Sequence, residues 1–148
     1  MFDALDSLKP HAHWLLRVGL ASVFLYHGIG KAMDLGGFSQ MMGLPTPVAA
    51  LVTFAELAGG AGIIVGAFYA QIPGLPRTPI MNDLITRLAG LAIAPVMLGA
   101  IFMVHWPRWD FMAAEGSPAG GMELQVVVLL TALYFLVMGN GAGSSQAS

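Results

Sequence analysis

The chain has 148 residues, 57% of which are hydrophobic, and its charged side chains are six Lys or Arg and eight Asp or Glu. Because an ordinary soluble domain has about 25% charged residues, the 9% found in this chain excludes a soluble monomer. A net charge of -2 without a basic cluster excludes nucleic-acid binding, and a cysteine count of 0 excludes disulfides and thiolate-held cofactors.

Four apolar runs follow one another along the chain, and each has about the 20 residues that a membrane-spanning helix requires. In chain order they are residues 14–31, 48–70, 84–105 and 122–138. Arg17 lies within the first run and no small-residue cleavage site follows it, so this run is not a cleavable signal. The sequence therefore predicts an all-α fold, an integral membrane four-helix bundle, in a single domain over residues 1–148.

The connections between the runs contain residues that end and begin helices. Pro45 and Pro47 separate the first two runs, and the second connection, from Gln71 to Asp83, contains three prolines. The third run has Pro95 near its middle, which predicts a kink in that helix.

Basic residues are distributed unequally between the two ends of the predicted bundle. Four lie toward the end that carries the termini and two toward the other end: Lys9, Arg17, Arg77 and Arg87 against Lys31 and Arg108. Because cytoplasmic segments of membrane proteins are enriched in Lys and Arg, this excess predicts that both termini are cytoplasmic. An aromatic belt at the level of the lipid headgroups is predicted from Trp14 at one end and Tyr26, Trp106 and Trp109 at the other.

Small residues gather on the second predicted helix. Ala58, Gly62 and Gly66 recur every four residues, and Gly59 and Gly60 widen this small face. Helices within a membrane approach one another most closely through such small residues. The second helix is therefore predicted to pack closely against its neighbours.

Ionisable residues within the predicted spans must face protein or water, because a charge near the bilayer centre costs roughly 2.5–3.5 kcal/mol. By depth they form two groups. Arg17 and Arg87 lie near the end that carries the termini, whereas five residues from all four helices lie toward the other end: His27, Lys31, Glu56, His105 and Glu123. On the first helix, Arg17, His27 and Lys31 fall within an arc of about 80°, which should face the bundle interior.

Glu56 is the deepest carboxylate, about 12 Å into its predicted span. A carboxylate at that depth is either paired or protonated, and Lys31 and His27 are its natural partners by depth and helix face. The other charged residues have simpler structural interpretations. Arg17 and Arg87 would reach lipid phosphates or end a helix, Lys31 would lie at a helix end, and Glu123 would be a first-turn acid favoured by the helix dipole.

Two kinds of site are consistent with the second group. In the first, His27 or His105 and Glu56 bind a quinone-like headgroup and exchange protons with it, and Lys31 holds the developing anion. In the second, His27, His105, Glu56 and Glu123 bind a metal, although the sequence lacks the Glu-x-x-His pairs of di-iron bundles. A b-type haem between His27 and His105 is a third alternative.

Short motifs occur in a fixed order along most of the chain, from about residue 14 to residue 143. They are Arg17, Tyr26-His27-Gly28-Ile29-Gly30-Lys31, Gly43-Leu44-Pro45, Glu56-Leu57-Ala58-Gly59-Gly60, Gly66, Thr86-Arg87, His105, Glu123 and Gly139-Asn140-Gly141. This set resembles the DoxX family of small four-helix membrane proteins. The resemblance implies a bacterial inner-membrane protein. Some members of that family are the quinone-linked membrane subunit of thiosulfate oxidation or of a terminal oxidase, and others belong to membrane redox complexes or maturation systems.

The resemblance also implies which residues form a site. Six residues match the polar pattern of the family: Arg17, Lys31, Glu56, Arg87, His105 and Glu123. The chain departs from the family in two places. The connection from Gln71 to Asp83 is longer than the usual short Thr-Arg connection, which suggests a contact surface for a partner, and the tail after Gly141 lacks the Ser-x-Asp ending.

Together these observations predict a membrane subunit of a redox complex that uses a quinone and has the lipid bilayer and other protein subunits as partners. Glu56 and His27 are the expected catalytic residues, and no metal is assigned. The expected cofactor-binding residues are Lys31, His105, Glu123, Arg17 and Arg87. The alternative is a non-catalytic assembly or interaction subunit, whose intramembrane charges pair with a neighbour and whose Gln71–Asp83 connection docks it.

Overall fold

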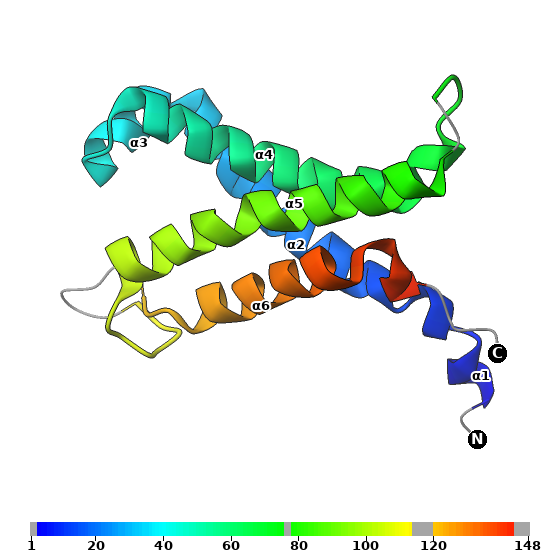
Figure 1. Ribbon diagram of the computed structural model, residues 1–148. Helices are drawn as coiled ribbons and strands as arrows, with labels where there is room; N and C mark the ends of the chain where they lie inside the picture. The colour runs from blue at the N-terminus through cyan, green and yellow to red at the C-terminus, as the bar shows by residue number, and fades with distance from the viewer. Residues whose placement is uncertain (1–2, 76–77, 114–119, 144–148) are drawn as a thin grey trace.

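The computed structural model describes residues 3–75, 78–113 and 120–143. Every regular element within these ranges is helical, which confirms the all-α fold. Figure 1 shows long helices lying along one another, with the first helix, α1 (Asp3–Asp6), and the turn Gly139–Gly143 at the same end of the bundle. We call this the termini end. The opposite end, where α3 (Leu35–Met42) lies, is the groove end.

Four long helices account for the four predicted apolar runs. They are α2 (His13–Met33), α4 (Thr46–Phe68), α5 (Pro79–Ala100) and α6 (Glu123–Met138). Short turns continue three of them: Tyr69–Gln71 after α4, the π-helical turn Ile101–His105 after α5, and Gly139–Gly143 after α6. Pro95 lies inside α5, which is α-helical on both sides of it.

Three of these helical segments are long and apolar enough to cross a membrane. They are Thr46–Gln71, Ile80–His105 and Glu123–Gly141. The chain is therefore a multi-pass membrane protein. Helix α2 has 21 residues but falls outside this set, and it carries Arg17, His27 and Lys31. The membrane crossing of α2 and the orientation of the termini stay predictions.

Short helices that the sequence did not predict lie at both ends of α2. They are α1, the turn Lys9–His11 and α3. Asp34 caps the start of α3, because its side-chain oxygen Oδ1 accepts a hydrogen bond from the backbone N–H of Gly37 at 2.8 Å. Gly43 follows the last residue of α3, and its φ of +61° is a left-handed conformation that favours glycine. The connection between the first two predicted runs is therefore partly helical.

The long helices pack in the order α2, α4, α5 and α6, and α2 has little direct contact with α6. In Figure 1, α4, α5 and α6 lie side by side while α2 crosses behind them. Buried apolar side chains from all four helices form one core: Leu20, Phe24, Ile63, Ala89, Ile93, Met97, Val128, Ala132 and Phe135. The bundle is thus a series of neighbouring pairs and not a ring of equal contacts.

The small face of α4 makes the close contacts that the sequence predicted. A Cβ added to Gly62 would lie 2.9 Å from a side chain of α5, and one added to Gly66 would overlap Thr86. On the other side of α4, a Cβ on Gly60 would lie 3.1 Å from Leu25 of α2. The glycines therefore allow α4 to pack closely against both of its neighbours.

The second connection is shorter than the sequence indicated. The turn Tyr69–Gln71 continues α4, and α5 already begins at Pro79, because proline is well suited to the first turn of a helix. Helical residues therefore replace both ends of the long loop expected from Gln71 to Asp83. Arg77, which contributed to the predicted orientation, lies outside the described residues.

Candidate functional site

Polar side chains, some of them buried and others partly exposed, gather at both ends of the bundle, and the two groups differ in how they are bonded. At the termini end the group consists of Arg17, Asp83, Thr86, Arg87 and Asn140, which we call the termini cluster. At the groove end, Lys31 of α2 and Glu56 of α4 form an ion pair beside a groove between α2 and α3.

Arg17 is completely buried, with 0% of its surface exposed. Its Nε donates to Nδ1 of His13 at 3.0 Å, and its Nη2 donates to Oδ1 of Asn140 at 2.7 Å. Its Nη1 donates to the backbone oxygen of Ile63 and, at 3.3 Å, to the hydroxyl of Thr86. Arg17 therefore joins α2 to α4, to α5 and to the turn after α6, and it does not reach toward lipid phosphates.

Arg87 connects α5 to the end of α6. Its Nε donates to Asp83 at 2.6 Å, and its Nη1 donates to the backbone oxygens of Leu136 and Val137 at 2.9 and 2.6 Å. A cation is favourable there because the last carbonyls of a helix carry partial negative charge. The other oxygen of Asp83 accepts from the backbone N–H of Asn140 at 2.9 Å.

The contacts of the termini cluster are structural. Within the described residues, none of its side-chain N or O atoms is both buried and without a hydrogen-bond partner. The guanidinium of Arg17 also lies 4.7 Å from the ring centre of Phe135, within the range of a cation–π contact. The expected cofactor-binding roles of Arg17 and Arg87 stay predictions, and both side chains already hold helices together.

At the groove end, Glu56 has the partner that depth and helix face predicted. Nζ of Lys31 donates to Oε1 of Glu56, and the exposed side-chain fractions are 21% for Lys31 and 2% for Glu56. Gly28 permits this contact between α2 and α4, because a Cβ there would lie only 2.9 Å from Leu57. The second oxygen, Oε2 of Glu56, is buried and has no hydrogen-bond partner among the described residues. An unpartnered buried oxygen is costly, which distinguishes Glu56 from the fully bonded side chains of the termini cluster.

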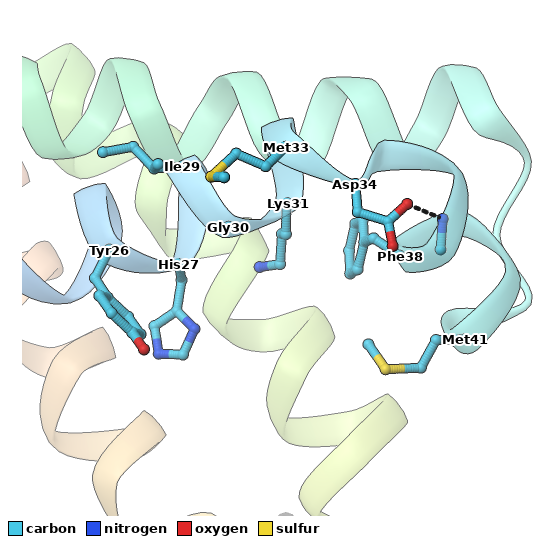
Figure 2. A pocket seen from close by; sticks show the side chains of 10 residues that line it. Tyr26, His27, Ile29, Gly30, Lys31, Met33, Asp34, Phe38 and Met41 are labelled. Carbon is cyan, nitrogen blue, oxygen red and sulfur yellow. Dashed lines mark hydrogen bonds between the residues drawn. The ribbon is translucent and has the colours of Figure 1, made fainter.

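A groove of about 640 Å³ lies against α2 and α3 next to this ion pair. Its lining residues are Tyr26, His27, Ile29, Gly30, Lys31, Met33, Asp34, Gly37, Phe38 and Met41. Figure 2 shows His27 and Lys31 projecting from α2, with Phe38 of α3 beyond Lys31. The polar ends of His27 and Lys31 thus meet a mostly apolar surface.

His27 belongs to the groove and not to the buried ion pair. It is exposed, and within the described ranges it has no hydrogen bond to Glu56. The prediction that His27 faces the bundle interior with Arg17 and Lys31 is therefore wrong. The long stem of Lys31 reaches across to α4, whereas the short side chain of His27, at the edge of the same arc, stays on the surface of α2.

Helix α3 supplies one wall of the groove. Phe38 is buried, and Nζ of Lys31 lies 4.9 Å from the centre of its ring, a cation–π distance. Met33 and Met41 are exposed at the rim. The ammonium group of Lys31 therefore contacts a carboxylate on one side and an aromatic ring on the other.

His105 lies apart from the groove. Its Nδ1 is 3.2 Å from the backbone oxygen of Gly120, and its Nε2 is 2.9 Å from Nε2 of Gln125. A proton on Nδ1 that is donated to Gly120 leaves Nε2 to accept from Gln125. His105 lies in the π-helical turn after α5, and in the described structure its hydrogen bonds are with Gly120 and Gln125, whereas the sequence predicted contacts with Glu56 and His27.

The remaining alternatives lack the geometry that they require. Glu123 is the first residue of α6, a first-turn acid, and it does not line the groove. In the described part of the chain, no three His, Asp or Glu side chains come together closely enough to hold a metal ion. Both ring nitrogens of His105 are engaged, so neither is free to ligate a haem iron opposite His27.

Several residues of both sites have weak signals in the sequence. Asp83 and Thr86 lie one turn apart near the start of α5, and only the fold brings Asn140 to them. Phe38 belongs to a helix whose one local signal is Asp34 followed by glycines. Gln125 is a polar residue in an otherwise apolar helix, and the sequence does not indicate that it lies beside His105.

Comparison with known families agrees with the resemblance seen in the sequence. Residues 12–72 match the model of the DoxX family. The matched part includes α2, α3 and α4, so it contains the Lys31–Glu56 pair and the whole groove, whereas Arg87, His105 and Glu123 lie beyond it. No curated protein and no solved structure matches the chain.

Proposed function

Because this chain belongs to the DoxX family, matched over residues 12–72, and is a multi-pass membrane protein, we propose that it is a subunit of a quinone-linked redox complex in a bacterial inner membrane. One observation carries the proposal. The buried Lys31–Glu56 pair, with one unpartnered carboxylate oxygen, adjoins an apolar groove that also contains His27 and Phe38.

The residues of the groove suit the headgroup of a quinone. The ring of Phe38 and the methionines offer an apolar surface for a flat ring, and Lys31 and His27 offer hydrogen-bond donors to its carbonyl oxygens. His27 and Lys31 are four residues apart, so they follow each other along α2 about 6 Å apart. Their spacing allows both to contact one ligand.

The side chains have different roles in this proposal. Lys31 donates a hydrogen bond to the headgroup and balances negative charge there, while Glu56 holds Lys31 from the buried side. His27, which is open to the groove, exchanges a proton with the bound headgroup. A bound quinone supplies the coupled transfer of electrons and protons. Since the chain has no cysteine, electrons reach the site through a partner protein.

The first experiment is native mass spectrometry of the tagged protein, gently extracted from its own membranes. Recovery with a redox protein and a stoichiometric quinone supports the proposal. Recovery with partners but without quinone contradicts it and favours the alternative of a non-catalytic assembly subunit. In that alternative the buried charges would pair with a neighbour, but Arg17, Lys31 and Arg87 are each already bonded within the chain.

A second experiment tests the residues. Glu56→Gln should abolish quinone-linked turnover of the complex while the complex still assembles, because Gln keeps the shape but cannot hold the ammonium of Lys31 as an anion does. Asp6→Asn is a matched control, since Asp6 lies in α1 and its carboxylate is exposed beside Lys9. Loss of assembly with normal turnover in the remaining complex would show that Glu56 is structural.

A further inference from the structure

The contact between Arg17 and His13 fixes the protonation state of His13. Nε of Arg17 donates to Nδ1 of His13 at 3.0 Å. Since a guanidinium group has donors only, Nδ1 must accept this hydrogen bond, and so it carries no proton. His13 is therefore neutral when the contact is made, with its single ring proton on Nε2. A second proton would place the N–H of an imidazolium against the N–H of a guanidinium, and the hydrogen bond would be lost.

The surroundings of His13 also disfavour its charged form. His13 is the first residue of α2, just before the predicted span of residues 14–31, and this helix begins without a side-chain cap and without an acidic residue in its first turn. The N-terminal end of a helix carries partial positive charge. Burial, followed by the guanidinium of Arg17 and then by His11, holds the pKa of His13 below its ordinary value of 6.5. Because the unfolded chain binds the proton more readily, the stabilisation by neutral His13 is complete above about pH 6.5 and is lost as the pH falls below the lowered pKa.

The other charged groups at the termini end do not offset a charge on His13. Among the side chains that the structure describes, those of α1, the following turn and α5 form two ion pairs: Lys9 with Asp6 at 2.7 Å and Arg87 with Asp83 at 2.6 Å. The one carboxylate of α4, Glu56, belongs to the groove end, and the group of α6 that interacts electrostatically with Arg17 is Tyr134. A protonated His13 would therefore face Arg17 without an unpaired carboxylate beside it in the described structure.

We propose that His13 forms a pH-sensitive contact, which holds residues 3–12, the N-terminal arm, onto the bundle. When His13 is neutral, it accepts from Arg17, and the turn Lys9–His11 of the arm packs against the turn Gly139–Gly143. Figure 1 shows α1 and this second turn at the same end of the bundle. In acid, His13 becomes charged and turns away from Arg17, the first turn of α2 loosens, and the arm separates from the turn after α6.

Release of the arm leaves the rest of the bundle in place. Nη1 and Nη2 of Arg17 contact Ile63, Thr86 and Asn140, and none of these bonds involves His13. The change is therefore a local opening, which requires less free energy than unfolding of the bundle. It depends neither on the groove nor on a membrane crossing of α2.

The absence of cysteine allows a direct test by distance measurement, because two introduced cysteines take spin labels selectively. Leu5→Cys on the arm and Leu130→Cys on α6 are suitable positions, since these side chains are 57% and 60% exposed. Electron–electron double resonance is measured on the labelled full chain in detergent micelles. It should give a single distance at pH 8 and a second, longer and broader distribution at pH 5.5.

Two histidine variants identify the group that responds. His13→Gln should keep the pH 8 distance at both pH values, because glutamine does not titrate and its amide oxygen still accepts from Arg17. His11→Gln is the matched control, since His11 is an exposed histidine two residues earlier, and it should respond as wild type does. The unfolding midpoint of wild type should also fall by about 3 °C or more between pH 8 and pH 5.5, the shift expected from the loss of one hydrogen bond. That of His13→Gln should fall by less.

Three results overturn the proposal. They are an unchanged distance in wild type at pH 5.5, a response of His13→Gln equal to that of wild type, and loss of the response in His11→Gln, which would assign it to the other histidine. If His13→Gln does not fold, ¹⁵N NMR of the histidine rings in the wild-type chain gives the answer. The second proton must arrive on His13 over the same pH range as the arm separates, and separation while His13 is still neutral overturns the proposal.

Discussion

At the termini end of the bundle, Arg17 is fully buried and its donors reach four acceptors, whereas at the groove end Glu56 is almost as deeply buried and keeps one oxygen without a partner in the described structure. Both ends place a charge inside an apolar bundle. At the termini end the protein itself supplies every partner, and at the groove end it does not. Charged residues therefore hold helices together at the termini end and form a candidate binding site at the groove end.

The difference follows from how the helices approach each other. At the termini end, Asn140 in the turn after α6 comes within hydrogen-bond distance of α2 and α5 together. At the groove end, α3 turns away from α2 after Asp34, and the exposed face of α2 is left beside it. Burial alone does not separate Arg17 from Glu56, whereas their hydrogen bonding does, because the donors of Arg17 all have acceptors and Glu56 has one oxygen without a partner in the described structure.

The largest expected effect is the removal of Arg17. Arg17→Ala should lower the free energy of unfolding by about 3–5 kcal/mol, because it leaves a cavity and removes the donor to Ile63, Thr86 and Asn140. The measurement is thermal unfolding in detergent micelles. Arg17→Lys should recover only part of the loss, since an ammonium cannot reproduce the guanidinium fork. An unchanged midpoint for Arg17→Ala would mean that the termini cluster does not fasten the helices.

The second-largest expected effect concerns helix packing at the termini end, separately from the hydrogen bonds there. Gly66→Ala should cost about 1–3 kcal/mol, because its Cβ would overlap Thr86 and force α4 away from α5. Gly19→Ala, with no atom within 4 Å of its added Cβ, is the control and should be neutral or slightly stabilising. Equal unfolding midpoints for the two variants would contradict the close α4–α5 contact.

The groove end should behave differently when its charges are replaced together. The double substitution of Lys31→Met with Glu56→Leu should leave the free energy of unfolding unchanged or raise it by up to about 2 kcal/mol, because apolar residues often replace a buried ion pair without loss. Quinone binding should nevertheless be lost. Unfolding and ligand titration are measured on the same preparation. A large loss of stability would show that the Lys31–Glu56 pair, like Arg17, mainly holds helices together.

The smallest effect concerns the wall of the groove. Asp34→Ala should destabilise α3 by about 1 kcal/mol, because the cap on the N–H of Gly37 is removed, while Asp34→Asn should retain most of it. Hydrogen exchange of the Gly37 amide is the direct measurement. Faster exchange in Asp34→Ala only, with slow exchange in α4 unaffected, is the expected result. Equal exchange rates of the Gly37 amide in wild type, Asp34→Ala and Asp34→Asn would contradict the capping role of Asp34.

The sequence alone determined the class of fold and the main features of the bundle. The lengths of the apolar runs predicted the long helices, because a bilayer requires about 20 apolar residues per span. The spacing of Gly62 and Gly66 predicted the close packing of α4, and the depth of Glu56 predicted its pairing with Lys31. These features depend on periodicity and on the cost of isolated charges, which are local properties of a helix.

Only the tertiary structure decided which polar residues share a site. His27 and Lys31 lie on neighbouring parts of one helix face and both line the groove, yet only the longer side chain of Lys31 also reaches Glu56. His105, in the π-helical turn after α5, is bonded to Gly120 and to Gln125 of α6. Such contacts join residues far apart along the chain, and their distances depend on helix crossing and register, which no single helix encodes.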